Sequence, residues 1–164
     1  MKVLYYGGQK SGKSYLAEQK SLELSQNKKP YYIATYDNSY GDTEMQKRIL
    51  KHQKQREEMF ITIEESMDLT RHIKAQNTYL VDCVSMWLLN NIDKPEDRLL
   101  EQIDSLKEVE ANIVFVLNSV NEGVIPMDRV SRRFVDLTGI IGQRLALICD
   151  EVYEVKLGLS KRLK

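Results

Sequence analysis

Lys2-Val3-Leu4-Tyr5-Tyr6 runs directly into Gly7-Gly8-Gln9-Lys10-Ser11-Gly12-Lys13-Ser14, and the architecture of the chain follows from these residues. The apolar run predicts a short strand, and the residues after Ser14 are compatible with a helix. Between them, Gly7, Gly12, Lys13 and Ser14 have the spacing G-x-x-x-x-G-K-[ST] of a phosphate-binding loop. Glycine lets the backbone turn tightly, so consecutive N–H groups and the helix N-terminus can converge on phosphates.

The side chains of this loop indicate how a triphosphate would be held. We expect Lys13 to reach the terminal phosphates and Ser14 to offer its hydroxyl to Mg²⁺. All eight loop residues are predicted to bind nucleotide: Gly7, Gly8, Gln9, Lys10, Ser11, Gly12, Lys13 and Ser14. The alternative is a plain glycine turn with a surface lysine. The predicted strand before the loop and the predicted helix after it favour phosphate binding.

Composition predicts one globular domain over residues 1–164. Hydrophobic residues make up 42% and charged residues 29%, which is typical of a soluble protein. Lys+Arg and Asp+Glu number 24 each, so no basic excess favours a nucleic-acid partner. Cys83 and Cys149 lie in or beside apolar runs, and we expect two buried free thiols rather than a disulfide or metal cluster.

Two further features bear on where the protein works. Lys2 leads directly into the first predicted strand, without the pattern of a secretory leader. No apolar run is long enough to span a bilayer. We therefore expect a cytoplasmic protein with no membrane partner.

Strand and helix patterns alternate along the chain. After the loop, apolar runs predict strands at 31–35, 60–63, 78–84, 111–117 and 151–155. Helical patterns are predicted at 14–25, 43–58, 66–75, 85–91, 94–109 and 127–149. Such alternation predicts an α/β fold with a mostly parallel sheet flanked by helices on both faces. With the loop at the first strand, this is a single-domain P-loop NTPase of the RecA-like kind.

Asp82 stands at the carboxyl end of the strand predicted over 78–84. Ligands of open α/β sheets bind at the carboxyl ends of the strands. Asp82 is therefore predicted as the carboxylate that, with Ser14, holds Mg²⁺. The alternative is an aspartate that caps the following helix.

The helix predicted over 43–58 carries a histidine on a defined face. Met45, Ile49, His52 and Arg56 are spaced to share one side of the helix. An imidazole beside arginines has the chemistry of a nucleophile toward phosphorus. Spacing alone, however, favours a histidine that packs beside Met45. We expect the other histidine, His72, to be a solvated helix residue, and Trp87 to lie in the core or a subunit contact.

The longest predicted helix, 127–149, has an apolar stripe from Val130 to Ile148. Its other side carries arginines, including Arg129, Arg132, Arg133 and Arg144. These arginines are candidates for phosphate contacts, although pairing with acids or solvation is the more usual role.

In these residues the chain resembles the adenosylcobinamide kinase/adenosylcobinamide-phosphate guanylyltransferase family of cobalamin biosynthesis. The likeness covers nearly the whole chain. It rests on the loop at 7–14, on Tyr32-Ile33-Ala34-Thr35, on Glu44-Met45-x-x-Arg48-Ile49-x-x-His52-x-x-x-Arg56, on Glu64-Glu65, on Leu80-Val81-Asp82-Cys83, on Gly123-Val124-Ile125-Pro126, on Arg133-Phe134-x-Asp136-x-x-Gly139, on Gln143, and on Asp150-Glu151-Val152.

The resemblance implies two reactions. A nucleoside triphosphate, ATP or GTP, phosphorylates the aminopropanol hydroxyl of adenosylcobinamide. GTP then gives GMP to an enzyme histidine, and GMP passes to adenosylcobinamide phosphate to form adenosylcobinamide-GDP. On this reading His52 is the nucleophile, and Lys13 with Mg²⁺ neutralises the pyrophosphate. The resemblance also implies nucleotide contacts at Ala34, Thr35, Arg56 and Glu64, and a homotrimer.

Three positions differ from the family's usual pattern: Lys51, where a second histidine is common, Ser119, where a carboxylate is common, and Gly142, where an asparagine is common. They leave two alternatives open. One is a P-loop small-molecule kinase without a covalent step. The other is a nucleotide-binding protein that has lost catalysis.

Overall fold

The computed structural model describes residues 1–26, 28–36 and 58–164. The strands are β1 (Lys2–Gly7), β2 (Tyr31–Ala34), β3 (Ile61–Glu64), β4 (Thr78–Asp82), β5 (Asn112–Asn118), β6 (Glu151–Lys156) and β7 (Leu159–Arg162). The helices are α1 (Lys13–Ser25), α3 (Val84–Asn90), α4 (Glu96–Glu108) and α5 (Arg129–Ile148). The helix predicted over 43–58 falls almost wholly outside the described residues, and with it His52 and Arg56.

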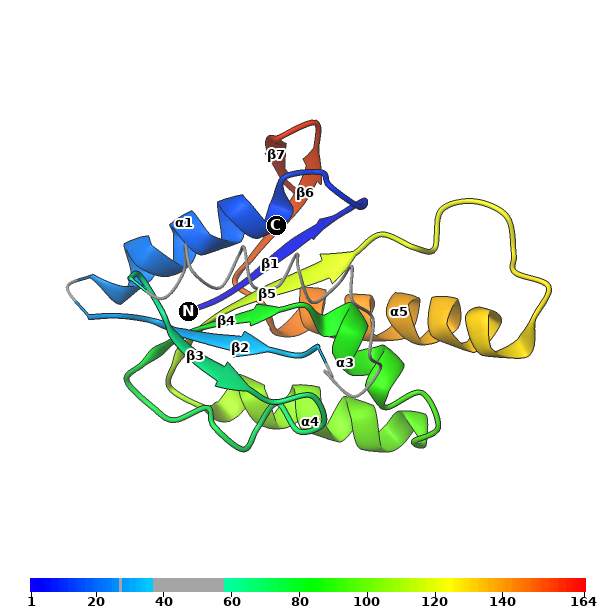
Figure 1. Ribbon diagram of the computed structural model, residues 1–164, viewed down its shortest axis with the longest axis horizontal. Helices are drawn as coiled ribbons and strands as arrows, with labels where there is room; N and C mark the ends of the chain where they lie inside the picture. Colours follow the sequence, from blue (N-terminus) through cyan, green and yellow to red (C-terminus); the bar gives the residue numbers. More distant parts are fainter. Residues whose placement is uncertain (27, 37–57) are drawn as a thin grey trace.

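The seven strands form one sheet in the order β3-β2-β4-β5-β1-β6-β7. Every neighbouring pair is parallel except β6 and β7 (Figure 1). The register pairs Gly7 with Asn118 and Ala34 with Asp82, so the ends of β1, β5, β2 and β4 meet at one edge. This arrangement confirms the predicted mostly parallel α/β sheet and brings the loop after β1 to the same edge as Asp82.

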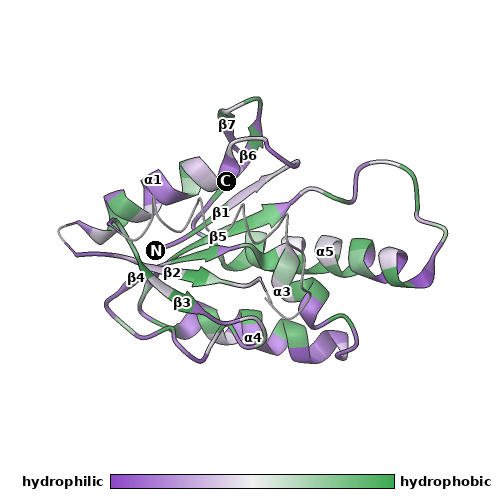
Figure 2. Cartoon of the chain, viewed as in Figure 1, coloured by the Kyte–Doolittle hydropathy of each residue, from purple (hydrophilic) through white to green (hydrophobic). Residues whose placement is uncertain are grey.

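Helices cover both faces of the sheet. In Figure 1, α1 lies above the sheet and α4 and α5 lie below it. Alternate residues of β1 divide between two cores: Val3 and Tyr5 pack with Ala17 of α1, whereas Leu4 packs with residues of α3, α4 and α5. In Figure 2 the central strand β5 is green, in keeping with its buried side chains from Ile113 to Leu117. A run buried on both faces is typical of a central parallel strand.

Helix α5 confirms the predicted long helix. Asp128 caps its start by accepting a hydrogen bond from Ser131 N at 2.8 Å. Two of the predicted arginines serve the fold: Arg133 donates to Ile92 O and Lys94 O, and Arg144 pairs with Asp104. Trp87 is fully buried, which confirms its predicted place in the core. Among the described residues, no helix combines the length and apolarity needed to cross a bilayer.

The chain closes with a hairpin that the sequence analysis missed. The sequence patterns predicted no strand beyond residue 155, but β7 pairs antiparallel with β6. The turn residues Leu157 and Gly158 both have positive φ, 54° and 78°. A two-residue turn of this kind usually carries Asn or Gly first, so leucine gave no turn signal. Gly158 N donates to Ser11 O at 2.8 Å, which places the turn against the phosphate loop.

The helix predicted over 66–75 is wrong, because this segment consists of turns and bends. The Glu65 carboxylate accepts hydrogen bonds from Met67 N and Asp68 N, both at 3.0 Å. Asp68 Oδ1 accepts from Thr70 N at 2.9 Å. These short-range side-chain bonds replace the helical backbone ladder. His72 is accordingly no solvated helix residue: it is half-buried, with Nε2 3.4 Å from Glu65 Oε2.

Candidate active site

The phosphate loop joins the end of β1 to the start of α1. Gly12, the residue before α1, has φ +95°, a backbone conformation that favours glycine. At Gly7 an added Cβ would lie 2.4 Å from Val155 O of β6, so a side chain has no room. Both glycines of the predicted motif are therefore required by geometry.

Lys13 is buried at the base of this loop, with 6% of its surface exposed. Its Nζ donates to Gly8 O at 3.0 Å, which holds the ammonium across the loop. Burial lowers the pKa of Lys13, and the neighbouring Cys83 and Asp82 oppose that shift. A buried cation in this position can neutralise the charge of a bound phosphate.

The predicted metal-binding pair lies together. Ser14 Oγ is 3.4 Å from Asp82 Oδ1, although 68 residues separate the two in sequence. A hydroxyl and a carboxylate are the hard oxygen donors that Mg²⁺ prefers, and at P-loops Mg²⁺ keeps several waters and phosphate oxygens as further ligands. The donor set thus fits Mg²⁺. Among the described residues, no group of three or more His, Cys, Asp or Glu side chains could hold a metal by itself.

Three further residues lie at this edge of the sheet but were not predicted from the sequence to belong to the site: Tyr32, Cys83 and Asn118. Tyr32 OH donates to Asp82 Oδ2 at 2.9 Å. Cys83, half-buried at the start of α3, is contacted by Asn118 Nδ2 at 3.9 Å from its Sγ. Burial, with Asp82 beside it, raises the pKa of the Cys83 thiol to about 12, so it is neutral at physiological pH. The sequence could have indicated Tyr32 and Asn118 as site residues only if the strands that end beside Asp82 were known. That knowledge requires the order of strands in the sheet.

The nucleotide contacts that the resemblance implies at the ends of β2 and β3 lie at the same edge of the sheet. Thr35 is fully buried, and its hydroxyl donates to Cys83 O at 2.7 Å and accepts from Cys83 N at 3.0 Å. Ala34 pairs in register with both Asp82 and Glu64. Because three strands separate β3 from β1, Glu64 lies roughly 19 Å away from the phosphate loop, counting about 4.8 Å per strand. Glu64 is therefore placed for a distant part of a ligand rather than for the phosphates.

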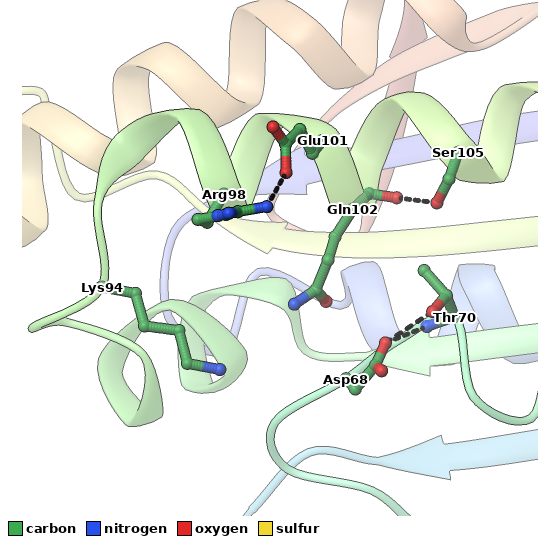
Figure 3. A pocket seen from close by; sticks show the side chains of 7 residues that line it. All are labelled: Asp68, Thr70, Lys94, Arg98, Glu101, Gln102 and Ser105. Atoms are coloured by element: carbon green, nitrogen blue, oxygen red, sulfur yellow. Dashed lines mark hydrogen bonds and ion pairs between the residues drawn. The ribbon is translucent and has the colours of Figure 1, made fainter.

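Two hollows border the loop that follows β5, and one of them also borders the phosphate loop. A groove of about 460 Å³ runs along the phosphate loop, between Ser119 and Glu122 on one side and Glu154 to Leu157 on the other. A cleft of about 720 Å³ lies along α5 and includes Asn121, Arg129, Asp136 and Gln143. A third hollow, of about 420 Å³, lies between residues 68–70 and the start of α4 and contains none of the predicted site residues (Figure 3).

The family described as CobU, cobinamide kinase / cobinamide phosphate guanyltransferase, matches residues 3–163 of this chain. The chain belongs to this family. Its kinase and nucleotidyltransferase chemistry requires a triphosphate site, and the phosphate loop is the candidate for it. The assignment confirms the family inferred from the sequence.

Relatives of this family match the chain from end to end. The bifunctional adenosylcobalamin biosynthesis protein CobP of Pseudomonas aeruginosa is 35% identical, over 100% of this chain and 98% of that protein. The bifunctional adenosylcobalamin biosynthesis protein CobU of Escherichia coli is 32% identical, over 100% of both chains. Among solved structures, the KaiC-like protein PH0186 of Pyrococcus horikoshii has a TM-score of 0.50 at 12% identity, over 93% of this chain and 69% of that one. This last likeness supports the RecA-like fold alone.

Proposed function

We propose that this chain is a bifunctional adenosylcobinamide kinase and adenosylcobinamide-phosphate guanylyltransferase. The observation that carries the proposal is the phosphate loop with Lys13 across it and Ser14 beside Asp82, in a chain that matches the family over residues 3–163. We further propose that residues 1–164 act as one nucleotide-binding catalytic domain in the cytoplasm, with no nucleic-acid or membrane partner.

In the kinase step, the aminopropanol hydroxyl of adenosylcobinamide attacks the γ-phosphorus of GTP or ATP. The bond from this phosphorus to the β-phosphate oxygen breaks, GDP or ADP leaves, and the hydroxyl proton passes to solvent. Lys13 offsets charge that builds on the phosphate oxygens. Ser14 and Asp82 would hold Mg²⁺, which when bound screens the phosphates and orients them for in-line attack. The loop glycines let the backbone amides approach the same oxygens.

In the guanylyl step, a ring nitrogen of His52 attacks the α-phosphorus of GTP and pyrophosphate leaves. A phosphate oxygen of adenosylcobinamide phosphate then attacks the same phosphorus, breaks the P–N bond and releases His52. Two in-line displacements replace one difficult transfer. We assign Arg56, four residues beyond His52 in the sequence, to charge on the nucleotide, and Ala34 and Glu64 to its more distant parts.

We also propose that the protein is a homotrimer. The loop between β5 and α5 and the first turn of α5 expose apolar side chains: Val124 (96%), Ile125 (77%), Met127 (96%) and Val130 (58%). Neighbouring exposed apolar residues of this kind are common at subunit contacts. The exposed cluster supports burial of this loop against another subunit.

The covalent step has a direct test. Protein incubated with Mg-GTP is examined by intact mass spectrometry, and we expect a fraction that has gained one GMP and loses it in acid. His52→Ala should abolish the adduct. The chain has two histidines, so His72→Ala serves as a matched control and should keep it. If wild-type protein phosphorylates adenosylcobinamide but never gains GMP, the guanylyltransferase half of the proposal is wrong.

A further inference from the structure

The two oxygens of the Asp82 carboxylate have different neighbours. Oδ1 lies 3.4 Å from Ser14 Oγ, whereas Oδ2 accepts the Tyr32 hydroxyl at 2.9 Å. Tyr32 is itself 5% exposed, and its ring meets Phe60 edge-on at a centroid distance of 6.1 Å. The phenol is therefore held by packing, and its hydrogen bond fixes which carboxylate oxygen faces Ser14.

Thr35, three residues after Tyr32, holds the backbone just after Asp82. Thr35 Oγ1 donates to Cys83 O at 2.7 Å and accepts from Cys83 N at 3.0 Å. Thr35 is held in turn, because Asn90 Nδ2 of α3 donates to Thr35 O at 2.7 Å and to Ser66 O at 3.1 Å. One buried threonine thus joins the ends of β2 and β4 to α3.

We propose that Tyr32 and Thr35 are positioning residues for the metal-binding carboxylate of Asp82. The inference rests on the proposed function, since it takes Asp82 and Ser14 as the Mg²⁺ site. Tyr32 sets the rotation of the carboxylate, and Thr35 sets the position of the peptide that carries it. Carboxylates that bind metals are usually oriented by such hydrogen bonds, and losing one typically weakens the metal about 10- to 100-fold.

This role differs from the nucleotide contact that the family resemblance implies for Thr35. A threonine hydroxyl has one O–H, and here it is donated to Cys83 O. The hydroxyl cannot also donate to a phosphate unless it gives up that bond. A ligand contact would therefore change the nucleotide affinity itself, whereas a positioning role changes only the part that depends on Mg²⁺.

The test measures the affinity for GTP by calorimetry, once with Mg²⁺ and once with EDTA. The ratio of the two dissociation constants is the Mg²⁺ increment. Tyr32→Phe and Thr35→Val each remove one hydroxyl at nearly constant volume. We expect the increment to fall about tenfold in either variant, with the affinity in EDTA within twofold of wild type. Thr35→Ser keeps the hydroxyl and should restore the increment.

Tyr79→Phe is the matched control. This buried tyrosine also lies in the sheet, and its hydroxyl accepts from Lys74 N at 2.9 Å, away from Asp82. It should lower the melting temperature and leave the increment unchanged. The inference is overturned if Tyr32→Phe and Thr35→Val keep the wild-type increment, or if they lose affinity equally with and without Mg²⁺. If wild-type protein shows no increment, the proposed metal site itself is wrong.

Discussion

At Gly7 the phosphate loop and strand β6 approach too closely for a side chain. A Cβ there would meet Val155 O at 2.4 Å and Ser11 Oγ at 2.9 Å. Gly8, the next residue, has no atom within 4 Å of the corresponding position. Of these two adjacent glycines, Gly7 is therefore constrained by packing, whereas Gly8 is not.

We expect Gly7→Ala to destabilise the fold by about 1–3 kcal/mol, the usual range for an overpacked site, because the backbone of the loop or of β6 must shift. Urea unfolding measures the change. Gly8→Ala is the control and should stay within about 0.5 kcal/mol of wild type. Equal stability of the two variants would show that the loop relaxes away from Val155 at little cost.

Among the elements, the segment between β3 and β4 departs most from its sequence pattern. Glu65 is 7% exposed, and its carboxylate holds Met67 N, Asp68 N and Arg71 Nη1. Burial acts to raise the pKa of Glu65, but the Asp68 and Met67 amides and Arg71 outweigh it and leave the pKa below its usual value. The segment is therefore organised around a charged carboxylate.

A lowered pKa in the folded state means that the charge of Glu65 stabilises the fold above its ordinary pKa of 4.5, and that this contribution is lost as pH falls below it. We expect Glu65→Gln to cost about 1–3 kcal/mol at pH 7, and the difference from wild type to shrink as the pH drops below 4.5. Denaturant unfolding over a pH series measures this. A cost of Glu65→Gln that does not change with pH would contradict the electrostatic account.

In the whole molecule, the sheet separates two hydrophobic cores. The phosphate loop connects strand β1 of this sheet to helix α1. A ligand bound there touches residues whose positions depend on the entire parallel sheet. A ligand that binds the native state and not the unfolded chain therefore raises the free energy of unfolding of the whole fold by mass action.

At GTP concentrations 100-fold above the dissociation constant, this linkage amounts to about 2.7 kcal/mol, or roughly 5–10 °C in melting temperature. We expect Lys13→Met to lose most of the rise that Mg-GTP causes, because the ammonium proposed to neutralise the phosphates is gone. Differential scanning calorimetry with and without Mg-GTP measures it. Lys28→Met, beyond the far end of α1, should keep the full shift. An undiminished shift in Lys13→Met would exclude this lysine as a phosphate ligand.

The amino-acid sequence alone determined the phosphate loop, the α/β alternation and Asp82 at a strand end. Each is a local pattern: fixed spacing in the loop, apolar runs in the strands, and an acid where a buried run stops. The sequence alone did not reveal that residues 66–75 are not helical. The Glu65 and Asp68 side chains accept hydrogen bonds from backbone N–H groups of this segment, and these bonds compete with helical ones.

The tertiary structure decided which distant residues meet. The order β3-β2-β4-β5-β1-β6-β7 brings Ser14 to Asp82, Tyr32 and Thr35 to the end of β4, and Gly158 onto the phosphate loop. No short-range pattern encodes this order, because it follows from burying both faces of one sheet with the crossovers that the connections allow. The phosphate-loop motif is encoded by neighbouring residues, whereas the contacts that support Asp82, the proposed metal-binding carboxylate, exist only in the folded sheet.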